Sequence, residues 1–173
     1  CGHDGHTAML LAAAKYLAST RGFAGQAVLI FQPGEEAGGG ARAMIAEGFL
    51  ARYPLDEVYA LHNMPGLAVG AYATRPGPIM AAADMFSIEI SGRGGHAAQP
   101  HLALDPVMIA GHVLVALQTV VARNVDPLKP AVLAVSTVVS DGSGACVVSW
   151  WVVLIGTVRS FEVGVQDLVE ARL

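Results

Sequence analysis

The stretch Gln26-Ala27-Val28-Leu29-Ile30-Phe31-Gln32, closed by Pro33-Gly34, decides the fold that this sequence predicts. Its short length and almost wholly apolar composition are typical of a strand that is buried on both faces of a parallel sheet. Glu35 and Glu36 follow directly. Because ligands gather at the carboxyl ends of parallel strands, these two carboxylates mark a candidate functional site.

The segments around this stretch predict an α/β domain over residues 1–80. Apolar residues at helical spacing predict an amphipathic helix over 7–20, and a shorter helix is expected over 41–48. Residues 57–62 have the pattern of another strand, with His62 at its end. This alternation of helix and strand is typical of a domain with a mainly parallel sheet.

A second unit is predicted over residues 84–173. Arg75-Pro76-Gly77-Pro78 marks the crossing between the two domains. Beyond it the sequence predicts strands and helices in the order strand, helix, strand, strand, helix, over residues 86–90, 105–123, 131–139, 152–160 and from Glu162 onward. That order is most of a ferredoxin-like α+β unit.

The composition excludes several classes of function. The chain has 173 residues, of which 54% are hydrophobic and 14% charged, so it can bury a sizeable core. Its net charge is -4 and it contains no run of Lys and Arg, so neither nucleic acid nor an anionic membrane is an expected partner. Its apolar stretches are interrupted before the roughly 20 residues that a membrane span needs.

The two cysteines, Cys1 and Cys146, are too few for a disulfide framework. They favour a reducing compartment, and we expect a cytoplasmic protein. The chain begins on Cys1 rather than on Met, which indicates a fragment.

Side chains that bind metals or carry protons lie in four short motifs, and each motif has an unremarkable alternative. Cys1 and His3 would lie on the same side of an extended backbone and could share one metal, or they could be incidental to a helix-entry turn. Glu35 and Glu36 would point to opposite sides, so that one binds a metal and the other holds a water, or they could form an exposed acidic loop.

The remaining two motifs each centre on a histidine. His62 alone would be read as a buried histidine satisfied by backbone, although the neighbouring motifs favour a ligand. His96 lies among glycines that permit close backbone approach, so it could reach another site or be a solvent-exposed turn residue. Taken together, the four motifs predict a hydrolytic metal site.

These motifs, in this order along the chain, resemble the M20 metallopeptidase family, in its amidohydrolase branch of hippurate hydrolases, N-acyl-amino-acid amidohydrolases and auxin-conjugate hydrolases. The residues that carry the resemblance are Cys1-Gly2-His3-Asp4-Gly5-His6, Gln32-Pro33-Gly34-Glu35-Glu36, Leu61-His62-Asn63-Met64-Pro65 and Gly92-Arg93-Gly94-Gly95-His96-Ala97-Ala98-Gln99-Pro100-His101. The resemblance resumes at Gly156-Thr157-Val158-Arg159-Ser160-Phe161.

The resemblance implies part of a zinc-peptidase-like catalytic domain with an inserted ferredoxin-like lid and dimerisation domain. It also implies two divalent metal ions (zinc, manganese, cobalt or nickel) bridged by Cys1, with His3, Glu36 and His62 as further ligands. Glu35 would be the general base. His96 would reach the partner's active site in a homodimer and stabilise the oxyanion. The substrates would be N-acyl amino acids, cleaved at the amide.

Two departures from the family pattern limit this expectation. The family carries one more metal-ligating histidine beyond Leu173, and strands that precede Cys1, so we expect this fragment to be inactive. Between Val139 and Val153 the family's Asn-Val-Ile-Pro is replaced, which indicates either two compensating frameshifts or divergence. These departures favour one alternative, a non-catalytic relic that retains a dimerising lid. Within the enzyme class, an aminoacylase, a dipeptidase or a deacetylase would use the same residues.

Overall fold

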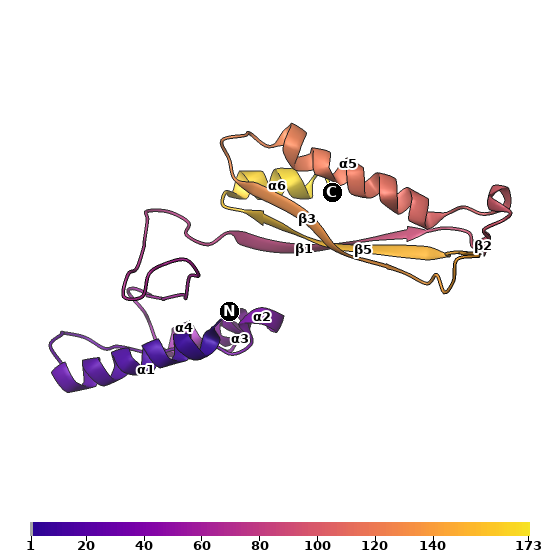
Figure 1. Cartoon of the computed structure of the whole chain (residues 1–173). Coiled ribbons are helices and arrows are strands. Elements are labelled where there is room, and N and C mark those ends of the chain that lie inside the picture. The colour runs from indigo at the N-terminus through magenta and orange to yellow at the C-terminus, as the bar shows by residue number, and fades with distance from the viewer. Residues whose placement is uncertain (1) are drawn as a thin grey trace. The chain divides into compact units, whose positions relative to one another are not determined.

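The computed structural model describes residues 2–173, so Cys1, the predicted bridging ligand, lies outside the described residues. The chain forms two compact units, residues 1–72 and residues 73–173 (Figure 1). They are unit 1 and unit 2, respectively.

Unit 1 contains four helices, of which the first is by far the longest. They are α1 (His3–Thr20), α2 (Glu35–Gly38), α3 (Gly40–Ala46) and α4 (Phe49–Arg52). The helix predicted over 7–20 is confirmed as α1, which begins four residues earlier. It ends where Arg21 turns into the left-handed region (φ 46°) and donates its N–H to the carbonyl of Leu17. None of its described residues is buried.

The strands predicted over 26–32 and 57–62 are not formed in the described part of unit 1, so the mainly parallel sheet is not confirmed. A strand needs a neighbour on its edge to satisfy its N–H and C=O groups. The apolar composition of 26–32 indicates burial but supplies no such neighbour. Leu29 and Phe31 remain 41% and 49% exposed, so among the described residues the run has no ladder partner and is only partly covered.

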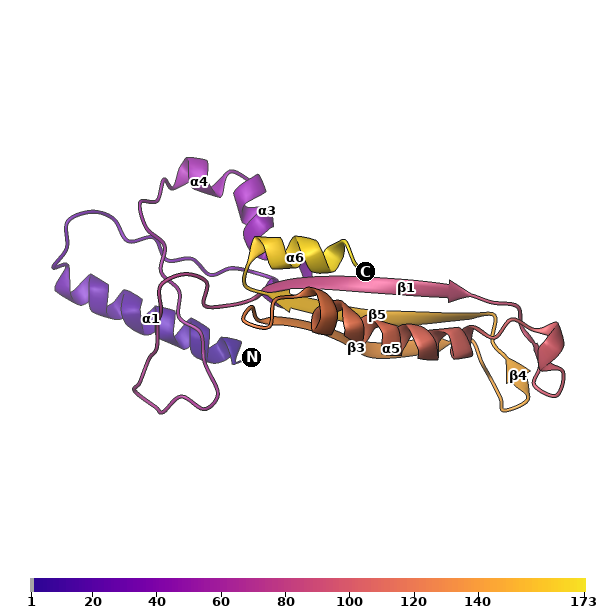
Figure 2. The same cartoon turned by 90° about the horizontal axis from the view of Figure 1, so that it is seen from above.

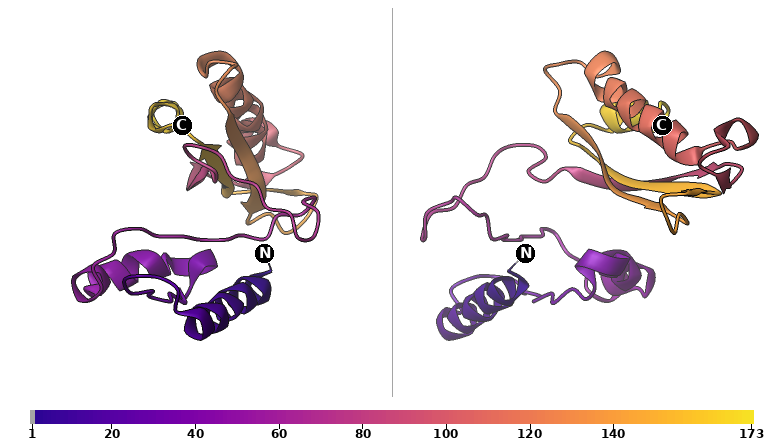
Figure 3. Two further views of the ribbon diagram at one scale, coloured as in Figure 1. Left: turned by 90° about the vertical axis from the view of Figure 1, so that its left-hand side faces the viewer. Right: turned by 45° about the vertical axis from the view of Figure 1, so that its right-hand side comes forward.

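Unit 2 is built on an antiparallel sheet of three ten-residue strands. These are β1 (Ala82–Ser91), β3 (Ala131–Ser140) and β5 (Trp151–Ser160), in the spatial order β1-β5-β3. Ser160 of β5 lies opposite Ala82 on one side and Ala131 on the other. Helices α5 (Pro106–Asn124) and α6 (Val163–Glu170) lie on one face of the sheet (Figures 1 and 3). The predicted order of elements is thus the observed one.

The core of unit 2 follows from the alternation along β5, where every second side chain faces the helices. Val152, Leu154 and Val158 are at most 1% exposed. Around them pack buried residues of both helices and of β3, namely Ala110, Leu117, Val120, Leu133, Val165 and Val169. Burying one such aliphatic side chain stabilises the fold by about 1.5–3 kcal/mol, so this layer holds unit 2 together.

Helix α5 begins where the sequence predicts a helix start. Asp105 is the N-cap, its carboxylate accepts from the N–H of Val107 at 2.9 Å, and Pro106 occupies the first turn. Among the described residues α5 is the one helix long and apolar enough to cross a membrane by length and composition. Ala110, Leu117 and Val120 are buried, so one face of α5 packs into the core of unit 2.

A short ribbon extends from one end of this sheet. Strand β2 (Gly95–His96) pairs antiparallel with β4 (Val147–Val148), which lies in the connection between β3 and β5 (Figure 2). The 3-10 helix η1 (Pro100–Leu102) follows β2. The ribbon therefore carries His96, the predicted oxyanion residue.

Candidate metal centre

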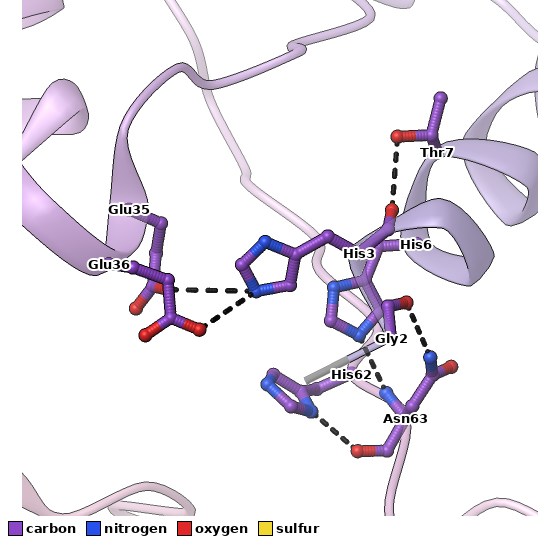
Figure 4. Close-up of polar contacts among 8 residues, drawn as sticks. All are labelled: Gly2, His3, His6, Thr7, Glu35, Glu36, His62 and Asn63. Carbon is purple, nitrogen blue, oxygen red and sulfur yellow. Dashed lines mark hydrogen bonds and ion pairs between the residues drawn. The ribbon is translucent and has the colours of Figure 1, made fainter.

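Three of the predicted site residues come together in unit 1 (Figure 4). His3 is the first residue of α1, and Glu35 and Glu36 are the first two residues of α2. His3 Nε2 lies 3.4 Å from Glu36 Oε1 and 3.8 Å from Glu35 Oε2. One ligand atom from each residue lies within 4.8 Å of the other two, close enough for one metal ion. All three side chains are exposed.

The two glutamates do not point to opposite sides, as an extended backbone would require. They open a helix, where neighbouring side chains are separated by about 100° around the axis. Both carboxylates therefore turn toward His3 (Figure 4). Backbone alternation therefore does not decide which glutamate is the metal ligand and which is the base. Both carboxylates can reach the region around His3 Nε2.

His62 is oriented by the backbone of the next residue. Its Nδ1 lies 2.5 Å from the carbonyl oxygen of Asn63. A carbonyl oxygen can only accept, so Nδ1 carries the proton and donates it. The lone pair of neutral His62 is therefore on Nε2, the nitrogen available to a metal. Its ring lies 4.5 Å from that of His6, in the same cluster (Figure 4).

Asn63 joins two chain segments of this cluster, its own and the one at the start of α1. Its backbone N–H donates to His6 Nε2 at 2.9 Å, and its side-chain Nδ2 donates to the carbonyl of Gly2 at 2.7 Å. A Cβ placed on Gly2 or Gly5 would lie only 2.4 or 2.9 Å from that Nδ2. The two glycines of the first motif are thus required for the close approach of the Asn63 side chain.

His6 has a structural role that the sequence reasoning did not assign. Its pKa is lowered by partial desolvation and then by the neighbouring His62 and His3. A lowered pKa keeps the ring neutral, and only the neutral ring can accept the Asn63 N–H. The signal that could have identified His6 and Asn63 was their presence in the quoted motifs beside His3 and His62.

The other predicted site residues have different outcomes. His96 lies on strand β2 of unit 2 and is not part of this cluster. Cys1 lies outside the described residues. The predicted roles of ligand, base and oxyanion donor therefore stay predictions, although the geometry gathers His3, Glu35, Glu36 and His62 into one cluster (Figure 4).

Comparison with known proteins identifies relatives along the whole chain. The pattern of peptidase family M20/M25/M40 matches residues 1–159. The chain is 47% identical over 173 residues to N-acetyl-L-cysteine deacetylase from Bacillus subtilis, covering 99% of this chain and 41% of that protein. It is 49% identical over 135 residues to hippurate hydrolase from Campylobacter jejuni, covering 78% and 35%. It is 40% identical to N-acetyldiaminopimelate deacetylase from Shouchella clausii, covering 100% and 46%.

Solved structures share the fold. An aminohydrolase from methicillin-resistant Staphylococcus aureus matches with a TM-score of 0.83 and 33% identity over 99% of this chain and 46% of that chain. A dinuclear metal-binding peptidase of family M20 from Bacillus subtilis matches with a TM-score of 0.71 and 31% identity, over 99% and 42%. The chain thus spans less than half the length of these relatives.

Proposed function

This chain belongs to peptidase family M20/M25/M40, and from that membership we propose that the complete protein is a two-metal amidohydrolase that cleaves the amide bond of N-acyl amino acids. The observation that carries the proposal is the cluster of His3, Glu35 and Glu36, whose ligand atoms lie within 4.8 Å of one another. The relatives' names support the substrate class, since hippurate, N-acetylcysteine and N-acetyldiaminopimelate all carry an acyl group on nitrogen.

The donor set fits divalent ions of the zinc, manganese, cobalt and nickel group, which accept imidazole and carboxylate ligands. His3, Glu36 and the free Nε2 of His62 would hold the ions, together with Cys1. Ions bound there would act as Lewis acids on the scissile carbonyl and make a water more acidic. Glu36 is favoured over Glu35 as the ligand because its carboxylate lies nearer to His3 Nε2.

Glu35 then serves as the general base. Its carboxylate takes a proton from the attacking water, whose oxygen bonds to the amide carbon. When the carbon–nitrogen bond breaks, the same proton passes to the departing amine. The products are a carboxylate and a free amino acid. His96 stabilises the oxyanion of the partner's active site in a homodimer, with residues 84–173 as lid and dimerisation domain and residues 1–80 as part of the catalytic domain.

A Glu35→Gln variant of the complete protein tests the base. Turnover of N-acyl amino acids should fall by about 10²–10⁴ because the proton acceptor is lost, while the metal content measured by elemental analysis stays at the wild-type level. The matched Glu36→Gln variant should instead lose metal. Unchanged turnover in Glu35→Gln would contradict the assignment.

Mixed dimers test the action of His96 across the interface. Neither Glu35→Gln nor His96→Ala subunits should be active alone, whereas mixing them should restore part of the activity by forming one intact site per dimer. An absence of restored activity, with mixed dimers demonstrated by mass spectrometry, would place His96 outside the partner's site.

Deacetylation is the second candidate function, because the deacetylases match a larger share of this chain than hippurate hydrolase does. The two deacetylases match 99% and 100% of this chain, whereas hippurate hydrolase matches 78%. The ratio of kcat/KM for N-acetyl and N-benzoyl derivatives of one amino acid decides between the acyl groups. Metal content separates both from a non-catalytic relic, which need not bind two equivalents.

A further inference from the structure

The ring of His96 accepts one hydrogen bond, and two backbone hydrogen bonds hold the turn that carries it. Its Nδ1 lies 3.1 Å from the backbone nitrogen of Ala98, and its carbonyl accepts from the N–H of Gln99 at 2.8 Å. The N–H of Ala97 donates to the carbonyl of Cys146 at 2.9 Å. The histidine thus sits at the start of a tight turn that is tied to the segment before β4.

The hydrogen bond from Ala98 determines which nitrogen of His96 carries the proton. A backbone N–H can only donate, so Nδ1 must accept and be unprotonated. The neutral ring therefore carries its proton on Nε2. An exposed Nε2–H is a hydrogen-bond donor, which is the group that stabilises an oxyanion.

The segment between Val139 and Val153, which departs from the family pattern, contains the strand that pairs with β2. Gly95 lies opposite Val148, and His96 lies opposite Val147. Val148 and Ser149 are 9% and 4% exposed. These two residues therefore pack into unit 2, whereas their neighbours Val147 and Trp150 are 49% and 59% exposed.

Trp150 contacts the loop that leads to His96. A Cβ placed on Gly94 would lie 2.6 Å from Trp150 Nε1, so the indole rests directly on that glycine. The Trp150 carbonyl accepts from the N–H of Gly92 at 2.7 Å. Asp141 Oδ1 in turn accepts from the N–H of Trp150 at 2.9 Å and of Trp151 at 3.3 Å.

We propose that Trp150 is a positioning residue. Its indole holds Gly94, and with it strand β2, next to the segment that follows β4, so that His96 presents a fixed Nε2–H donor. The ribbon has two residue pairs, and so short a ribbon is unstable by itself. The indole, which is 59% exposed, adds its contact with Gly94 to the hydrogen bonds that tie the ribbon to its neighbours. The proposal rests on the proposed catalytic role of His96, and it assigns a specific use to the divergent segment.

Kinetics of the complete protein test the functional part. Trp150→Ala should lower kcat by about tenfold through misplacement of the donor, with KM changed by less than about twofold because uniform substrate binding is kept. Trp150→Phe, which keeps a flat ring, should restore most of the loss. Leu128→Ala, at a residue that is 89% exposed, is the control and should match wild type.

A second background shows whether Trp150 acts through His96. His96→Ala should lower kcat by about 10²–10³, the loss typical of a deleted oxyanion donor. Adding Trp150→Ala to His96→Ala should then change kcat by less than about twofold. A further tenfold loss in that background would show a general structural effect and overturn the proposal.

NMR of this 173-residue chain with 15N-labelled histidine tests the positioning without any reference to activity. His96 should show the Nε2–H tautomer in wild type and in Trp150→Phe, and a mixture of tautomers in Trp150→Ala. If Trp150→Ala left the tautomer and the β2–β4 amide protection unchanged, the positioning role would be wrong. If these changed while His96→Ala kept full turnover, the positioning would stand and the proposed catalytic role of His96 would fail.

Discussion

Units 1 and 2 differ in where their apolar side chains go. All ten of the buried hydrophobic residues that form the core of the described chain, from Ala110 to Val169, belong to unit 2. In unit 1, α1 has no buried residue, and Leu29 and Phe31 of the apolar run are 41% and 49% exposed. Unit 2 is held by a hydrophobic layer between sheet and helices. In unit 1, hydrogen bonds of Asn63 to His6 and Gly2 tie its segment to the start of α1, beside the candidate metal cluster.

The difference shows what each unit needs in order to be stable. The sheet of unit 2 finds all its pairing partners within residues 82–160. The apolar run of unit 1 has the composition of a buried strand without a described partner. The predicted metal ligands therefore lie in the unit with the weaker packing, whereas the predicted oxyanion residue His96 lies in the unit with the stronger packing.

The same substitution made in both units gives the largest expected contrast. Leu154→Ala, at a side chain that is fully buried, should lower the free energy of unfolding of unit 2 by about 2–5 kcal/mol through lost contacts and a cavity. Leu29→Ala should change unit 1 by less than about 0.5 kcal/mol because the side chain is already partly exposed. Hydrogen exchange measured separately over residues 2–72 and 73–173 gives the change in stability of each unit. An equal loss of stability in Leu29→Ala would reveal a core in unit 1.

Divalent metal should sharpen the contrast by stabilising one unit alone. In the complete protein, zinc or manganese at 100 times its dissociation constant should protect the region of His3, Glu35 and Glu36 by about 2.7 kcal/mol. Protection of α1 and α2 from hydrogen exchange measures the effect, and β5 should show no change. The double variant His3→Ala/Glu36→Gln is the control, and equal protection in it would place the metal elsewhere.

A glycine-to-alanine pair tests how unit 1 keeps its histidines in place. Gly5→Ala puts a Cβ 2.9 Å from Asn63 Nδ2 and should weaken metal affinity about tenfold by displacing a residue that orients a ligand. Gly22→Ala, whose Cβ would meet no atom within 4 Å, should leave the affinity unchanged. Alanine favours helices over glycine, so a weaker affinity in Gly5→Ala would not be explained by helix propensity. Isothermal titration measures both, and equal affinities would show that the close contact is dispensable.

The smallest expected effect concerns the surface ion pair of unit 2. Lys129 Nζ lies 2.7 Å from Glu162 Oε2, and this hydrogen bond and charge raise the pKa of Lys129 above its ordinary value. The contribution of the pair is fully present below the ordinary lysine pKa and is lost as the pH rises through the raised pKa. Glu162→Gln should slightly lower the melting temperature at pH 7 and low salt, and this difference should vanish at high pH or high salt. Glu170→Gln is the matched control, and a large pH-independent loss would contradict the pair's peripheral role.

The fold of unit 2 was predictable from its sequence because its elements complete one another locally. Alternation along β1 and β5 and the Asp105-Pro106 start of α5 indicated the elements within a few residues. The sheet of unit 1 could not be predicted reliably, since the apolar run 26–32 specifies burial but not the strand that would pair with it. The composition of residues 26–32 was correctly identified as apolar, but that composition alone does not form a strand.

The candidate site was predicted in its residues and less well in its geometry. Glu35 and Glu36 were expected on opposite sides of an extended chain, but they open a helix and face His3 together. Asn63 and His6 connect the cluster through backbone and tautomer contacts, which depend on three-dimensional proximity across 57 residues and leave no periodic signal in the sequence. The role of Trp150 was likewise hidden, because its partner Gly94 lies far away along the chain.

The position of β5 in the sheet has a consequence for the synthesis of this protein. It is the last of the three long strands to be made, yet it is the central one, and in the described sheet β1 and β3 each pair with it. A nascent chain that has emerged only as far as Ser140 carries two strands that wait for a common partner. Residue 160 must therefore leave the ribosome before the sheet of unit 2 can close, and until then the edges of β1 and β3 lack their partner strand.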